Sequence, residues 1–231
     1  MKKRIIVLTG AGVSAESGID TFRDAGGLWE GHDVMEVASP EGWANNQELV
    51  LDFYNQRRKQ LREVQPNDAH KALVELEKNY DVHIITQNVD DLHERAGSSN
   101  VVHLHGELLK VRSTVYEHLV YEWPGELVFG DKCEKGAQLR PHIVWFGEMV
   151  PMLTVAADLT SSADIVMIIG TSMQVYPAAG LVGYAPPIAP IYYIDPKPSV
   201  NYELSRSDNL KVIAEKATSG VRKVVDELIK G

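Results

Sequence analysis

Small residues form the first chemical feature of the chain, directly after a short apolar run at residues 5–8. The turn Gly10-Ala11-Gly12 leaves its backbone almost bare of side chains. Because small residues let main-chain N–H groups approach an anion, such a turn suits a pyrophosphate. The glycines also fit an ordinary tight connection from a strand to a helix, and Ala15 stands where the common dinucleotide pattern has a third glycine.

Polar side chains follow two further apolar runs of the chain. Gln87, Asn88 and Asp90 come directly after the run 82–86, where open α/β sheets place their ligands. His105 follows the next short run, and its ordinary pKa near neutrality makes it a candidate general base. A buried histidine with a purely structural hydrogen bond is the alternative interpretation.

Tyr54 and Arg57 form a third candidate group, on a helix predicted over residues 46–64. Three residues of separation put both on one helix face. On the residues alone, the ordinary interpretation is a solvated basic face that includes Arg58, with Tyr54 half buried.

Alternating strands and helices must position these groups. The sequence predicts an α/β fold with a doubly wound, parallel Rossmann-like sheet, in which Thr171 and Ser172 follow the plainest buried strand. A smaller lobe with helices and β-hairpins is expected to interrupt the sheet, with ligands bound between the lobes. The predicted strands lie at 5–8, 82–86, 101–105, 139–148, 164–169 and 188–195, and the helices at 46–64, 68–79 and 221–229. One domain is expected over 1–231, with its large lobe at 1–27, 67–106 and 141–231 and its small lobe at 28–66 and 107–140.

Composition limits the classes of function. The 231 residues are 44% apolar and 24% charged, which is typical of a globular protein. A formal charge of -9 and a pI of about 5.4 argue against duplex nucleic acid as a partner. Cys133 is the one cysteine, so an intrachain disulfide and a multi-thiolate metal site are excluded. With no apolar run as long as a membrane span, we expect a cytoplasmic protein, monomeric and without a membrane partner.

Five segments taken together resemble the sirtuins, the NAD-dependent protein lysine deacylases. They are G-A-G-V-S-A-E-S-G-I-D-T-F-R at 10–23, T-Q-N-V-D-D-L-H-E-R-A-G at 86–97, H-L-H-G at 103–106, W-F-G-E at 145–148 and G-T-S-M-Q-V-Y-P-A-A-G at 170–180. The order is collinear and covers nearly the whole chain. The Tyr-x-x-Arg pair at Tyr54 and Arg57 most resembles the bacterial members of the class that contains desuccinylases and demalonylases. There the pair holds the carboxylate of the acyl group, for which a phenol and a guanidinium are suitable partners in a partly dry pocket.

The resemblance implies removal of succinyl, malonyl or acetyl groups from lysines of proteins or peptides. NAD would be a co-substrate, and nicotinamide and O-acyl-ADP-ribose the products. His105 would be the general base, and Asn88 and Asp90 would complete the catalytic set. The implied NAD contacts are Gly10, Ala11, Gly12, Ser14, Glu16, Phe22, Arg23, Gln87, Asn88, Asp90, Gly170, Thr171, Ser172, Asp195 and Ala217. The implied substrate contacts are Tyr54, Arg57, Val144, Phe146, Gly147 and Val175, with the peptide bound as an extended strand.

The sequence departs from the family pattern in three respects. The usual cysteine pairs of a structural zinc are absent near Ser113 and Gly136, so we expect no metal. Asp195 stands where an asparagine commonly meets the ribose, and Asp20 where many members have proline. The lobe without zinc is expected to pack through Val115, Tyr116, Val120, Tyr121, Trp123 and Phe129.

Two other functions remain open at this level. One is a sirtuin-like ADP-ribosyltransferase or NAD hydrolase, and the other is a non-catalytic NAD-sensing module. His105 separates the last from an enzyme, because a pure binding module needs no base.

Overall fold

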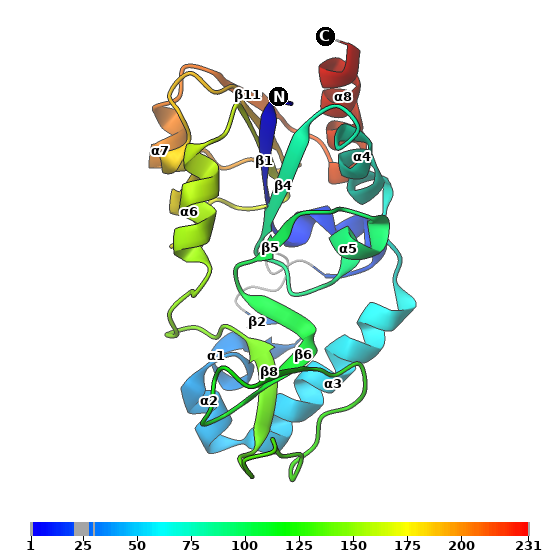
Figure 1. Ribbon diagram of the computed structural model, residues 1–231, viewed down its shortest axis with the longest axis vertical. Helices are drawn as coiled ribbons and strands as arrows, with labels where there is room; N and C mark the ends of the chain where they lie inside the picture. The colour runs from blue at the N-terminus through cyan, green and yellow to red at the C-terminus, as the bar shows by residue number, and fades with distance from the viewer. Residues whose placement is uncertain (1, 21–27, 30, 231) are drawn as a thin grey trace.

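Six parallel strands form the central sheet of the computed structural model, which describes residues 2–20, 28–29 and 31–230 (Figure 1). The strand order is β11-β10-β9-β1-β4-β5, so the first strand of the chain lies inside the sheet. The α/β fold with a parallel Rossmann-like sheet is thus confirmed. The strands are β1 (Arg4–Thr9), β4 (Asp81–Thr86), β5 (Val101–His103), β9 (Ile165–Ile169), β10 (Ile191–Ile194) and β11 (Leu210–Ile213).

Helices cover both faces of this sheet, because its central strands are apolar on both sides. Successive residues of β1 alternate between two cores: Ile5 and Val7 belong to one, Ile6 and Leu8 to the other. The first core includes α4 (Asp68–Leu76) and α8 (Ala217–Lys230), which lie beside each other in Figure 1. The second includes α6 (Leu153–Ser161) and the 3-10 helix η3 (Ala178–Tyr184). Short helices α5 (Leu92–Ala96) and α7 (Tyr202–Ser205) complete this part.

A second, antiparallel sheet lies at the far end of the molecule, in the order β7-β6-β8. The predicted strand over 139–148 ends at Ile143 and pairs with β6 instead of the parallel sheet. The lobe boundary predicted between residues 140 and 141 therefore falls within a strand of this sheet. Its strands are β6 (Gly106–Ser113), β7 (Val120–Glu122) and β8 (Leu139–Ile143).

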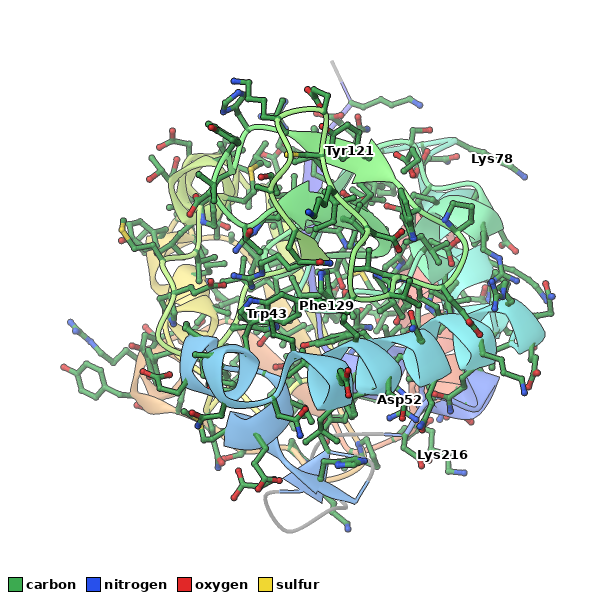
Figure 2. The ribbon with its side chains drawn as sticks, turned by 90° about the horizontal axis from the view of Figure 1, so that it is seen from below. Trp43, Asp52, Lys78, Tyr121, Phe129 and Lys216 are labelled. Atoms are coloured by element: carbon green, nitrogen blue, oxygen red, sulfur yellow. The ribbon has the colours of Figure 1, made fainter. Side chains whose placement is uncertain are left out.

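Three helices pack beside the small sheet. The longest, α3 (Gln47–Glu63), begins at Asn46, whose side chain accepts the N–H of Leu49 at 3.0 Å. Figure 2 shows this helix along one side of the molecule, with Asp52 on its outer face. The remaining elements are α1 (Val34–Val37), α2 (Pro40–Asn45) and the two-residue strands β2 (Leu28–Trp29) and β3 (His32–Asp33).

The packing of the small sheet corrects part of the sequence prediction. Val115, Val120 and Phe129 are 66%, 39% and 68% exposed, so they do not form its core. All three lie in loops or on a short outer strand, where an apolar side chain finds no facing layer. Tyr116, Tyr121 and Trp123 do pack there, as predicted. They surround the buried set Leu51, Val111, Leu127, Cys133 and Leu139.

The single thiol takes part in a hydrogen-bonded turn. Cys133 Sγ donates to Ser113 Oγ at 3.5 Å, and the same hydroxyl accepts the N–H groups of Val115 and Tyr116. Among the residues that the structure describes, no group of three or more His, Cys, Asp or Glu could hold a metal. The side chains around Cys133 therefore do not fit a tetrahedral thiolate site for zinc. Within residues 2–20, 28–29 and 31–230, no helix is both long and apolar enough to cross a membrane.

Candidate active site

Two glycine turns meet where β1 and β9 end side by side. Gly10 N donates to Ile169 O at 3.1 Å, and Gly12 N donates to Gly170 O at 2.8 Å. A Cβ atom added at Gly12 would lie 2.6 Å from Gly170 Cα, closer than any side chain permits. Gly170 also has a φ of +60°, which favours glycine. The glycines are therefore required for the contact between the two turns.

The first turn differs from the one expected on the sequence. It leads into two 3-10 helices of three residues each, η1 (Ala11–Val13) and η2 (Ala15–Ser17), and a long helix does not follow. The N–H groups of Gly10 and Gly12 already donate to backbone carbonyls. An anion at this turn would thus need other donors than these two.

A buried hydrogen-bonded group lies next to the first glycine turn and consists of Ser14, Asn88 and Asp90. Asn88 Nδ2 donates to Ser14 Oγ at 3.2 Å, and Ser14 Oγ donates to Asp90 Oδ2 at 3.0 Å. Asp90 also accepts the N–H of Leu92 at 3.1 Å. Burial raises the pKa of Asp90, and these two hydrogen bonds oppose the rise. The structure thus brings Ser14, which follows β1, together with Asn88 and Asp90, which the sequence places after the run 82–86.

Gln87 links this group to the second turn and to His105. Its Nε2 donates to Thr171 Oγ1 at 3.0 Å, and its backbone carbonyl contacts His105 Nδ1 at 3.1 Å. Burial lowers the pKa of His105, partly offset by the bond to that carbonyl. With Nδ1 as the donor to a carbonyl, Nε2 of a neutral imidazole is left as the basic nitrogen. That arrangement suits a general base at neutral pH.

His103 has different surroundings, which separates it from His105. Its Nε2 contacts Glu94 Oε1 at 2.7 Å, and its Nδ1 contacts the carbonyl of Asn88 at 3.0 Å. Burial is the largest single effect and lowers the pKa of His103, but the bond with Glu94, the charge of Glu94 and the contact with the Asn88 carbonyl together outweigh it, so the net direction is up. His103 therefore matches the structural alternative, with both ring nitrogens engaged.

A pair of fully buried histidines underlies the site, and no sequence pattern indicated it. His93 Nε2 contacts Thr9 Oγ1 at 3.2 Å, and the rings of His93 and His70 lie 4.8 Å apart. His70 Nδ1 accepts the N–H of Asn67 at 3.3 Å in the capping box of α4. Burial lowers the pKa of His70 to about 4 and holds that of His93 well below its ordinary value. Both are neutral near pH 7.

Three further predicted NAD contacts lie in η2, directly after β10 and at the start of α8. Glu16 accepts the N–H and the hydroxyl of Thr218 at 3.0 and 2.9 Å, which joins the first turn to helix α8. Ala217, at the start of that helix, is 4% exposed. Asp195 is 3% exposed and accepts the N–H of Lys197 at 2.8 Å. The further predicted contacts Phe22 and Arg23 lie outside the described residues.

Residues 144–148 run beside His105 as a tethered strip. Val144 N donates to His105 O at 2.9 Å, and Phe146 N donates to Ala38 O at 2.9 Å. Phe146 is 43% exposed, and Gly147 has a φ of +90°. Val175, the remaining predicted substrate contact, is 39% exposed on the loop after β9. The side chains of Phe146 and Val175 are therefore accessible from solvent.

Tyr54 and Arg57 share a face of α3, as predicted, but the surroundings are not a solvated basic face. Arg58 is fully buried and donates to Leu108 O and Asn55 Oδ1, both at 3.0 Å. Tyr54 is also fully buried, and its hydroxyl accepts the indole N–H of Trp145 at 3.0 Å. The Arg57 guanidinium lies 5.0 Å from the Phe53 ring centroid.

Comparisons with known proteins agree with this geometry. Residues 10–177 match the Sir2 family. A protein of Helicobacter pylori strain J99 named "NAD-dependent protein deacylase" is 60% identical over 228 residues, which is 99% of this chain and 96% of that protein. A solved complex of a Sir2 homologue with NAD superimposes with a TM-score of 0.87 at 40% identity, covering 99% of this chain and 90% of the other. A Sir2 protein bound to an acetylated peptide gives a TM-score of 0.80 at 26% identity, covering 100% and 95%.

Proposed function

We propose that this chain, which belongs to the Sir2 family and is an NAD-dependent protein deacylase, removes succinyl and malonyl groups from protein lysines as well as acetyl groups. The observation that carries the proposal is the pair Tyr54 and Arg57 on one face of α3. Burial raises the pKa of Tyr54, so its hydroxyl stays protonated and can donate to a carboxylate. The guanidinium of Arg57 supplies the matching positive charge.

The two glycine turns and the group Ser14, Asn88 and Asp90 are proposed to hold NAD. Support comes from the ends of β1, β4 and β9, which meet at one edge of the parallel sheet where such folds bind nucleotides. The amide of Asn88 and the carboxyl of Asp90 are buried and fixed, so they would orient the nicotinamide side without rearranging. The full proposed set is Gly10, Ala11, Gly12, Ser14, Glu16, Phe22, Arg23, Gln87, Asn88, Asp90, Gly170, Thr171, Ser172, Asp195 and Ala217.

His105 is proposed as the general base that removes a proton from a ribose hydroxyl of the substrate. Its lowered pKa keeps it neutral and able to accept that proton near pH 7. The Gln87 carbonyl contacts Nδ1, which leaves Nε2 as the ring nitrogen that can accept the proton of the ribose hydroxyl. NAD is consumed as a substrate, and the acyl group leaves lysine for the ribose of ADP-ribose.

The acyl-lysine peptide is proposed to bind as an extended strand along Val144, Phe146 and Gly147, with Val175 on the opposite side. The strip is anchored from behind through His105 and Ala38, which supports its use as a fixed template. A single catalytic domain with a large sheet lobe and a smaller lobe would place this strip between the two. Main-chain recognition predicts wide tolerance for the residues that flank the lysine.

The full burial of Tyr54 sets a condition for the acidic acyl groups. The ring centroid of Trp29 lies 4.9 Å from that of Phe53 and 6.0 Å from that of Tyr54, and both contacts are edge to face. A carboxylate reaches the Tyr54 hydroxyl only after a covering side chain moves aside. The acyl pocket is therefore proposed to open on substrate binding.

The test is a paired assay with NAD and one peptide that carries either acetyl-lysine or succinyl-lysine. Nicotinamide release and peptide mass are followed together. Arg57→Met should lower succinyl removal by about tenfold or more and spare acetyl removal, since one charge-assisted contact is lost. Lys59→Met removes an exposed cation from the same helix and should change neither rate. Nicotinamide release without deacylation would instead favour a transferase or NAD hydrolase.

A further inference from the structure

A chain of close contacts runs from the surface of the small sheet to the Tyr54 hydroxyl. Glu148 Oε1 accepts from Arg140 Nη1 at 2.6 Å, and Glu148 Oε2 accepts from Arg112 Nη2 at 3.2 Å. The side chains of both arginines are 10% exposed, and that of Glu148 is 21% exposed. Ion pairs that are largely removed from water add little net stability, because the cost of desolvation offsets their attraction.

Trp145 is held by this ion cluster in two separate ways. Its backbone N–H donates to Glu148 Oε2 at 2.8 Å, and the Arg140 guanidinium lies 3.3 Å from its ring centroid. Trp43 flanks the same ring at 5.7 Å. A backbone tether and a planar cation over the ring together fix where the indole N–H points.

That indole N–H donates to the Tyr54 hydroxyl, which fixes the role of the hydroxyl in turn. The oxygen of Tyr54 is occupied as an acceptor at 3.0 Å. An ionised carboxylate only accepts hydrogen bonds, so Tyr54 can bind it only as a donor, through its single proton. A hydroxyl that already accepts a hydrogen bond is also the stronger donor.

We propose that Trp145, together with Arg140 and Glu148, is a positioning residue that aims the Tyr54 hydroxyl at the carboxylate of an acidic acyl group and so sets the preference for succinyl over acetyl. The inference rests on the proposed removal of acidic acyl groups. It goes beyond that function by placing part of the selectivity in residues that do not touch the acyl carboxylate. Glu148 serves twice, since it also closes the turn that presents Phe146 and Gly147.

The decisive variant is Trp145→Phe, which keeps an aromatic ring for Arg140 and removes the indole N–H donor. The measured quantity is the ratio of kcat/KM for succinyl-lysine to kcat/KM for acetyl-lysine on one peptide. We expect this ratio to fall roughly fivefold, the effect of one net hydrogen bond, through a higher KM for the succinyl peptide. A ratio equal to that of the wild type would overturn the inference.

A double-mutant cycle with Tyr54→Phe separates positioning from general loosening of the fold. If Trp145 acts through the Tyr54 hydroxyl, Trp145→Phe should leave the ratio unchanged in the Tyr54→Phe background. Independent, multiplying effects would contradict the inference even if each single variant lowers the ratio. Thermal unfolding of all variants checks that the comparison is made between folded proteins.

Arg140→Lys provides a second route that leaves Trp145 intact. The charge opposite Glu148 is kept, whereas the planar contact over the indole is lost. The ratio should fall less than in Trp145→Phe but measurably, and an unchanged ratio would remove Arg140 from the proposal. A wild-type protein without succinyl activity would refute the proposed function and this inference together, whereas an active wild type with an unaffected Trp145→Phe ratio refutes the inference alone.

Discussion

The main-chain N–H of Val144 donates to the carbonyl oxygen of His105 at 2.9 Å. The proposed base and the first residue of the proposed peptide strip are thus joined by one hydrogen bond. The His105 ring contacts the Gln87 carbonyl at 3.1 Å, and Gln87 in turn contacts Thr171. A peptide strand that binds along the strip would therefore be held in register with the base and with the second glycine turn.

Replacement of His105 by glutamine should strongly slow deacylation and preserve the fold. A general base contributes roughly 10²- to 10⁴-fold, so kcat should fall within that range. Glutamine can still donate to the Gln87 carbonyl, which keeps the local structure. Peptide mass after incubation with NAD measures the loss. His83→Gln, near the opposite end of β4, is the matched control and should keep wild-type activity.

The pH dependence of kcat/KM follows from the lowered pKa of His105. The base must be neutral to accept a proton, so activity should fall as the pH falls through the pKa of the folded state. Because burial moves that pKa below 6.5, the acid limb should have its midpoint below pH 6.5. Initial rates between pH 5 and 9 measure it. A midpoint above 6.5 would contradict the assignment.

His70 should make the protein less stable in mild acid. Its pKa is about 4 when folded and 6.5 when unfolded, so the unfolded chain binds more protons between these values. Stability should therefore drop as the pH falls from about 6.5 toward 4, by about 2 kcal/mol between pH 7.5 and 5. Urea unfolding at both pH values measures the drop. His70→Gln keeps an acceptor for the capping box and should reduce the drop by that amount.

Gly170→Ala should destabilise the protein strongly. Its Cβ would lie 2.3 Å from Val13 N, and its φ of +60° disfavours any side chain. We expect a loss of roughly 2–4 kcal/mol in the free energy of unfolding, together with weaker NAD binding. Gly125→Ala is the control, because nothing lies within 4 Å of the added atom. Equal stability of the two variants would show that the turns do not need their close contact.

Chelation should leave the small sheet intact. The thiol of Cys133 is hydrogen-bonded to the hydroxyl of Ser113. Removal of divalent metal by a chelator should therefore not change the midpoint of thermal unfolding. Metal content of the purified protein provides an independent reading. A stoichiometric zinc ion, or a midpoint lowered by the chelator, would contradict the expectation.

The fold could be predicted where burial on both faces leaves a continuous apolar run. The strand over 165–169 is the clearest case, since all five of its residues are buried. β11 escaped prediction because it is an edge strand with two exposed residues among four, and its sequence does not alternate clearly. Helix α6 was likewise missed, because few of its residues are buried.

The sequence predicts which residues of the site follow a strand, but not which residues far apart in the chain contact one another. Residues that follow strands, such as Asn88 and Thr171, come together because parallel strands end at one edge. The contact between Glu16 and Thr218 joins residues 202 positions apart and has no local signal. Hydrophobicity alone also misplaced Phe129, because an apolar residue on a loop has no opposing layer to pack against.

The place of β1 inside the sheet has a consequence for synthesis of the protein. This strand is made before the other strands of the sheet, yet one of its neighbours, β9, begins only at Ile165. Until then the nascent chain carries an apolar strand with an unpaired edge, a feature that invites aggregation. The hydrogen bond between the two glycine turns, from Gly12 to Gly170, also forms only after this part of the chain has been made. A chain that ends before Gly170 therefore lacks the carbonyl oxygen that accepts the N–H of Gly12.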